Sequence, residues 1–130
     1  MTFHKDFLLP RILIGLMALA MAAATIPAYG NPTMNPGLTT LTGDALSLGQ
    51  TAGAFLGRQL TLILIALIGA VVGQRELVLI GAFGMMVMNG HDAILMGLLG
   101  GPVAAAIGGL VFAALGALSI YLVWRKPVSA

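Results

Sequence analysis

Four apolar segments, each long enough to cross a bilayer, constrain this chain more than any other feature of its sequence. They cover residues 7–29, 51–72, 77–99 and 102–124. A bilayer core needs roughly 20 apolar residues per helix, and only 8% of the chain is charged against 59% hydrophobic. The sequence therefore predicts an all-α, multi-pass integral membrane protein.

The links between these segments predict how the helices are arranged. Residues 30–50 are rich in Gly, Pro, Asn and Thr, which is typical of a loop. The other links, at 73–76 and 100–102, are very short. Short links place consecutive helices side by side and antiparallel, so we expect a single-domain, up-down four-helix bundle over residues 1–130.

The basic residues outside the apolar segments, or at their ends, predict the orientation in the membrane. All of them fall on one side of the expected bundle: Lys5, Arg11, Arg75, Arg125 and Lys126. Because cytoplasmic segments carry the excess of Lys and Arg, both termini are predicted to be cytoplasmic and loop 30–50 external. A secretory signal with small residues at 20–22 is the alternative for the first segment. We favour a retained span, since the apolar stretch continues past those residues and Asp6 lies ahead of it.

Two opposite charges lie inside apolar segments. Arg58 is seven residues into the second segment, and Asp92 is seven residues from the end of the third. At a rise of about 1.5 Å per residue, both lie roughly 10 Å below the outer surface. A lone charge at the helix centre costs at least about 2.5 kcal/mol on insertion scales. We therefore expect an intramembrane Arg58–Asp92 pair that faces the interior of the bundle.

Further polar residues gather around this pair, and two interpretations stay open. Asn89 is one turn before Asp92, so that both can face one neighbour, and His91 points to a third helix or a water-filled cleft. Gln59 and Thr61 lie beside Arg58 in the sequence. The cluster either fixes helix register or serves a ligand, a proton or a substrate.

Small residues repeat every four positions in two segments. Gly53 and Gly57 form one ridge, and Ala105, Gly109 and Ala113 form another. Such ridges let helices approach closely, and we expect packing within the chain rather than a dimer interface. Small side chains around a polar cluster also favour a cleft open to the outside.

Several kinds of chemistry are not supported by the sequence. The chain has no cysteine, which excludes disulfides and thiolate chemistry, and its net charge of +2 does not suggest nucleic-acid binding. His91 with the nearby Met85, Met86, Met88 and Met96 could bind Cu(I), but methionines are more often flexible core or lipid-facing residues. A zinc site lacks three convergent ligands. No Ser is placed to complete a catalytic triad. We predict no catalytic residue, metal or cofactor.

Three stretches carry a resemblance to a known family. The segments "GRQLTLILIALIG" (57–69), "GQRELVLIGAF" (73–83) and "NGHDA" (89–93) resemble small bacterial four-helix membrane proteins of the DoxX-like superfamily. The resemblance implies that Arg58 and Asp92 are a shared polar pair. It also implies a subunit of a bacterial inner membrane near quinone or thiol redox systems, although a chain without cysteine departs from the thiol chemistry.

Three functions follow from these patterns, none of them an enzyme activity. The first is an accessory or scaffold subunit of a membrane assembly, with other membrane subunits or a second copy as partners besides the lipid bilayer. The second is a binder of a small molecule or quinone-like lipid in an outward-facing polar cleft. The third is a small oligomeric, proton-coupled transporter in which Asp92 or His91 exchanges protons.

Overall fold

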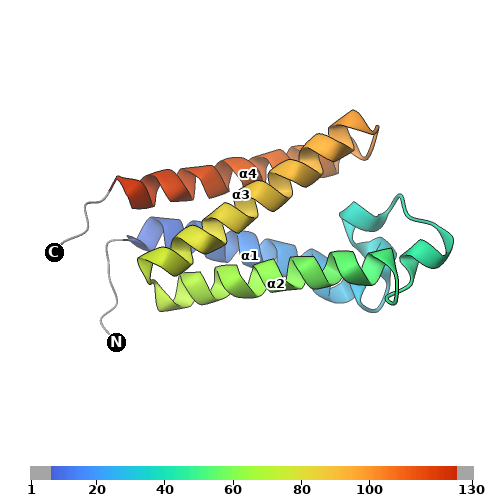
Figure 1. Cartoon of the computed structure of the whole chain (residues 1–130), viewed down its shortest axis with the longest axis horizontal. Helices are drawn as coiled ribbons and strands as arrows, with labels where there is room; N and C mark the ends of the chain where they lie inside the picture. The colour runs from blue at the N-terminus through green and yellow to red at the C-terminus, as the bar shows by residue number, and fades with distance from the viewer. Residues whose placement is uncertain (1–6, 126–130) are drawn as a thin grey trace.

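The computed structural model describes residues 7–125, which form four long helices (Figure 1). These are α1 (Leu8–Ala28), α2 (Thr51–Val72), α3 (Arg75–Leu98) and α4 (Val103–Trp124). All four are long and apolar enough to cross a membrane. The prediction of an all-helical chain with four candidate membrane spans is confirmed. The side of the membrane that holds its ends stays a prediction.

The four helices form a ring in which each packs against its neighbours in the sequence. α1 contacts α2 and α4, and α3 contacts the same two helices, so α2 and α4 lie across the diagonal. α1 begins and α4 ends at one end of the bundle, together with the α2–α3 link (Figure 1). We call this the basic end, after Arg11, Arg75 and Arg125, and the opposite end the loop end.

The link between α2 and α3 is shorter than predicted. Gly73 ends α2 in the left-handed conformation with φ of 72°, which glycine adopts without a Cβ penalty. Gln74 is extended, and α3 begins at Arg75 rather than at residue 77. Glu76 then lies in the first turn of α3, where the helix dipole favours an acidic residue. The predicted start at residue 77 was therefore two residues too late, because Gly73 and Gln74 alone form the link.

Arg11 joins α1 to the end of α2. Its Nε donates to the Ala70 carbonyl at 2.8 Å, and its Nη2 donates to the Val71 carbonyl at 3.0 Å. These carbonyls lack partners within their own helix, and a cation there also complements the helix dipole. A Cβ on Gly73 would lie 2.7 Å from the guanidinium. The contact therefore fixes the basic end of the α1–α2 pair.

The loop between α1 and α2 folds back onto the bundle. It contains three short 3₁₀ helices, η2 (Pro32–Met34), η3 (Pro36–Leu38) and η4 (Gly43–Leu46). Leu38 is fully buried and forms a hydrophobic cluster with residues of α1 and α2. The buried residues of this cluster are Ala28, Leu38, Ala52 and Leu56. The loop thus covers α1 and α2 at the loop end, where α3 and α4 contribute no buried residue to this cluster.

The loop-end half of α4 is the least covered part of the bundle. The buried residues of this helix are Gly116, Ser119 and Val123, all toward the basic end. In α3, the last buried residue before the loop end is Ala93. The α3–α4 pair therefore separates from the loop at this end, as Figure 1 shows. This separation leaves space for the cleft described below.

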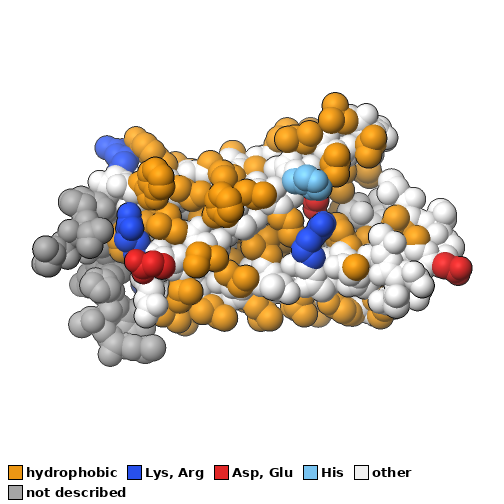
Figure 2. Space-filling view, in the orientation of Figure 1, with side chains coloured by type: hydrophobic (Ala, Val, Ile, Leu, Met, Phe, Trp, Pro, Cys, Tyr) orange, Lys and Arg blue, Asp and Glu red, His pale blue; other side chains and the backbone are white. Residues whose placement is uncertain are grey.

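Large apolar side chains are exposed around the whole bundle, among them Leu98, Leu99, Val103 and Trp124. Apolar side chains also cover most of the face in Figure 2. Soluble monomers rarely expose apolar patches of such extent. The surface therefore fits a surrounding bilayer.

Two neighbouring glycines of α4 face different surroundings. A Cβ on Gly109 would lie 2.8 Å from the Asn89 carbonyl oxygen and equally close to the Ala93 Cβ. A Cβ on Gly108 would meet no atom of residues 7–125 within 4 Å. At this level of the bundle, α4 thus approaches α3 closely at the first glycine and not at the second.

We expect Gly109→Ala to lower the free energy of unfolding by about 1–3 kcal/mol, because overpacking forces the α3 backbone to move. Thermal unfolding in lipid nanodiscs measures this loss. Gly108→Ala is the matched control and should keep or slightly raise stability, since alanine is the better helix former. Equal losses in both variants would show that the packing is described incorrectly.

Candidate functional site

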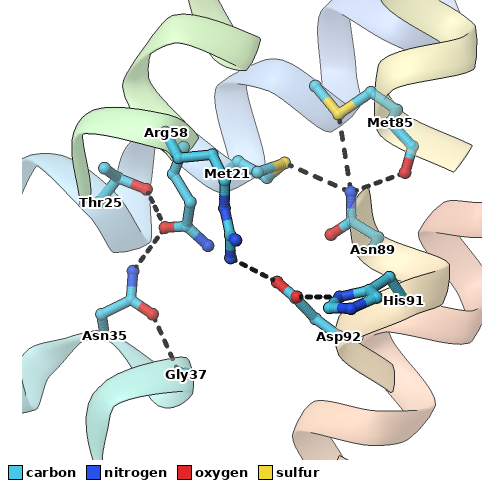
Figure 3. Close-up of polar contacts among 10 residues, drawn as sticks. Met21, Thr25, Asn35, Gly37, Arg58, Met85, Asn89, His91 and Asp92 are labelled. Carbon is cyan, nitrogen blue, oxygen red and sulfur yellow. Dashed lines mark hydrogen bonds and ion pairs between the residues drawn. The ribbon is translucent and has the colours of Figure 1, made fainter. Parts of the chain in front are cut away.

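Arg58, His91 and Asp92 lie together toward the loop end of α2 and α3 (Figure 3). Arg58 Nη2 is 3.5 Å from Asp92 Oδ2, and His91 Nδ1 is 3.1 Å from Asp92 Oδ1. The guanidinium also lies over the Phe55 ring, 5.4 Å from its centroid. Each oxygen of the carboxylate thus has one nitrogen partner.

The packing of α2 against α3 explains the long distance between Arg58 and Asp92. Near the link, Gly81 meets Ala66, and one turn farther Gly84 meets Leu62. Continuing this register places Arg58 opposite residues about one turn before Asp92. The Arg58 side chain therefore reaches along the bundle toward the loop end, and it meets the carboxylate at the limit of hydrogen-bond distance.

Arg58 is less interior than the sequence suggested. Of its side chain 51% is exposed, and of the His91 side chain 60%, whereas only 19% of Asp92 is exposed. Arg58, Thr61 and His91 line a groove of about 620 Å³ on the outer face between α2 and α3. Figure 2 shows a basic, an acidic and a histidine side chain side by side on this otherwise apolar face. The expectation of an inward-facing arginine was wrong, because α2 and α3 diverge before its level.

Asn89 and Gln59 face the interior instead. Asn89 Nδ2 donates to the Met85 carbonyl at 2.9 Å and lies 3.8 Å from the Met21 sulfur of α1. Gln59 Oε1 accepts hydrogen bonds from Thr25 Oγ1 and Asn35 Nδ2, both at 2.9 Å. The two amides therefore lie on the inner side of the helices that carry Arg58 and Asp92.

The Gln59 side chain holds the loop to the bundle. Thr25 of α1 is fully buried, and Asn35 of the loop is 2% exposed. Asn35 also accepts a hydrogen bond from the Gly37 amide at 2.9 Å, which caps η3. One glutamine oxygen thus joins α1, α2 and the loop. Asn35 was not predicted as a site residue, and its only signal was an Asn-Pro pair, which indicates a turn.

The remaining predicted residues act locally. Thr61 donates to the Gly57 carbonyl of its own helix at 2.9 Å, a common bond for helical threonine. Gly53 packs against the backbone of Leu48, and a Cβ on Gly57 would meet no described atom within 4 Å. The ridge on α2 therefore does not pack against another helix of residues 7–125.

The ridge on α4 faces α3. Gly109 packs against α3 as described above, and Ala113 Cβ is 3.4 Å from the position of a Cβ on Gly90. Ala105 lines the cleft. The predicted ridge thus packs against α3 within the chain, and Ala105, its residue nearest the loop end, borders the cleft.

The interior amides and Asp92 line a cleft of about 320 Å³. It lies between α1, α2, the loop and the loop-end halves of α3 and α4. Its polar side chains are few, and apolar or small residues form the rest of the wall: Ala20, Met21, Ala24, Pro36, Gly37, Phe55, Ala93, Met96, Ala104, Ala105, Gly108, Gly109 and Phe112. A concave, mostly apolar space with a few convergent polar groups is typical of small-molecule sites, and its volume is within their usual range.

Side chains of the kinds that bind metals do not gather in the described part of the chain. Among residues 7–125, no group of three or more His, Asp or Glu side chains lies close enough to hold a metal ion. The sulfur of Met85 contacts the amide of Asn89. The arrangement is therefore suited to hydrogen bonding and charge pairing.

Comparisons with protein-family models, curated proteins and solved structures find no match to this chain. The resemblance to the DoxX-like superfamily therefore stays a prediction.

We expect Gln59→Leu to lower the free energy of unfolding by about 1–3 kcal/mol, because the donors Thr25 Oγ1 and Asn35 Nδ2 lose their shared acceptor in a buried position. Limited proteolysis of the loop should become faster in the same variant. Gln50→Leu is the control, since Gln50 is exposed and its side chain makes no capping bond to α2. Equal behaviour of the two variants would contradict the role of Gln59.

We expect Asp92→Ala to lower folded yield and stability by about 1–3 kcal/mol, because it leaves Arg58 without its charged partner. Exchanging the two residues, as Arg58→Asp with Asp92→Arg, should recover part of the loss. A double-mutant cycle, read by thermal unfolding in nanodiscs, measures the coupling. Silent single variants would show that the pair contributes nothing to folding.

Proposed function

We propose that this chain is a multi-pass membrane protein that binds a small, largely apolar molecule in the cleft at its loop end. One observation carries the proposal: a 320 Å³ space in which Asp92, Asn89 and Gln59 converge among apolar and small side chains. Apolar walls favour burial of an apolar body, and a few placed polar groups fix its orientation.

The position of the cleft supports binding from the external side. It lies at the loop end, away from Arg11, Arg75 and Arg125. If the basic end is cytoplasmic, as the positive-inside pattern predicts, the cleft lies in the outer half of the membrane. A molecule reaches it there from the external solution or from the outer leaflet, and a quinone-like lipid is one candidate.

An accessory role in a membrane assembly is the second proposal, and the exposure of α4 favours it. Of the most apolar 18-residue stretch of α4, 11% is buried inside the bundle. The corresponding shares are 33% in α1, 28% in the span that contains α2 and 28% in α3. The outer face of α4 includes Ile107, Leu110 and Val111. A neighbouring membrane subunit would cover this face without obstructing the cleft.

We expect Gly108→Leu to remove the bound molecule without unfolding the chain. Gly108 lines the cleft, and its Cβ position is open, so that a leucine occupies the space a ligand needs. Native mass spectrometry of protein extracted in lipid particles without detergent should show a small-molecule adduct on the unmodified chain and none on this variant. The same spectra report any membrane subunit that remains attached.

Gly97→Leu is the matched control. Gly97 is exposed on α3, its Cβ position is equally open, and it does not line the cleft. This variant should keep the adduct. Loss of the adduct in both variants, or its absence from the unmodified chain, counts against binding in the cleft.

A further inference from the structure

The charges around the cleft are distributed unevenly. Asp92 is the only charged side chain among the described residues that line it, and the other polar lining groups are the amides of Asn35, Gln59 and Asn89. Arg58 and His91 line the groove on the outer face instead. The cleft is therefore adjacent to a negative charge and contains no positive one.

The carboxylate retains capacity for another partner. Charge-assisted N–H···O bonds are usually about 2.7–2.9 Å long, whereas Arg58 Nη2 lies 3.5 Å from Asp92 Oδ2. The guanidinium is also half exposed and shared with the Phe55 ring. A carboxylate has about four lone-pair sites, and Arg58 and His91 each approach one oxygen. Compensation of the negative charge is thus incomplete.

A second acceptor lies one helical turn away. The hydrogen bonds of Asn89 all involve Nδ2, so that within residues 7–125 its Oδ1 is not engaged. Asn89 and Asp92 both line the cleft from the same helix. Two residues that carry oxygen acceptors, one of them charged, therefore border the same space.

The aromatic and sulfur-containing walls favour the same kind of ligand. Phe55 and Phe112 line the cleft, as do Met21 and Met96. An aromatic face attracts a cation within about 6 Å of its centroid, and more strongly where water is excluded. Thioethers are polarizable and adapt to an apolar body.

We propose that the cleft selects an organic monocation, an amine or quaternary ammonium with an apolar body. The positive centre lies beside Asp92 and Asn89, and the apolar body lies against Phe112 and the small residues of α4. This inference rests on the proposed binding function and names the class of ligand. It has a distinctive consequence: Arg58 competes with the ligand for Asp92, so that the two partners of the pair affect binding in opposite directions.

The test uses two probes of similar size, benzyltrimethylammonium and the neutral N,N-dimethylbenzamide. Isothermal titration of the full chain in nanodiscs gives both affinities, with empty nanodiscs subtracted. We expect the ammonium to bind about tenfold tighter or more, because its charge attracts the Asp92 carboxylate in surroundings that screen less than water. Asp92→Asn should remove this preference, and Arg58→Gln should strengthen ammonium binding. Gly108→Leu should weaken both probes, and Gly97→Leu neither.

The outcomes separate this inference from the proposed function. Equal affinities or a preference for the amide, with both lost in Gly108→Leu, overturns cation selection and leaves the cleft as a binding site. An ammonium affinity that Asp92→Asn leaves unchanged also overturns it. Absence of probe binding, together with absence of a native adduct, overturns both. If Asp92→Asn fails to fold, two measurements still test cation selection. One is the comparison of the two probes on the unmodified chain, and the other is whether Arg58→Gln raises or lowers the affinity for the ammonium.

Discussion

An apolar surrounding makes every polar side chain of this bundle dependent on a partner within the protein. Unsatisfied polar groups cost several kcal/mol in hydrocarbon, and the described contacts reflect that cost. Arg11 binds the free carbonyls of α2, Thr61 and Ser119 bind carbonyls within their own helices, and Gln59 holds Thr25 and Asn35. At the basic end, Nε of Arg75 is buried without a hydrogen-bond partner. Toward the loop end, Asn89 and Asp92 border an open space.

The cleft lies between the α1–α2 pair and the α3–α4 pair, which are packed in different ways at the loop end. At the basic end, α1, α3 and α4 share one buried cluster that includes Ile14, Val78 and Val123. At the loop end, the folded loop covers α1 and α2 through Leu38, while α4 contacts α3 through Gly109. Each pair is packed internally, and the space between the pairs is left to the cleft.

The helices could be predicted from the sequence, and the faces of the polar residues could not. Apolar length alone locates four spans, because the thickness of a bilayer sets that length. Sequence spacing likewise predicted that Arg58 and Asp92 lie near each other along the bundle, and their side chains approach to 3.5 Å. Spacing does not predict toward which face the two side chains point. That depends on where α2 and α3 diverge, and Gly81 and Gly84 determine where the two helices approach closely. The role of Asn35 could not be predicted from the sequence either, because the loop returns to the bundle through a long-range contact that leaves no local periodicity.

Asp92 connects the cleft to the groove on the outer face. It lines the cleft, yet its two nitrogen partners, Arg58 and His91, line the groove. A charge that enters the cleft therefore acts on Arg58 through a shared carboxylate, in surroundings where electrostatic interactions are screened less than in water. Displacement of the half-exposed guanidinium would in turn change the surface offered to lipid or to a neighbouring subunit. A ligand in the cleft would thus be linked energetically to the position of Arg58 in the groove, through the carboxylate that both contact.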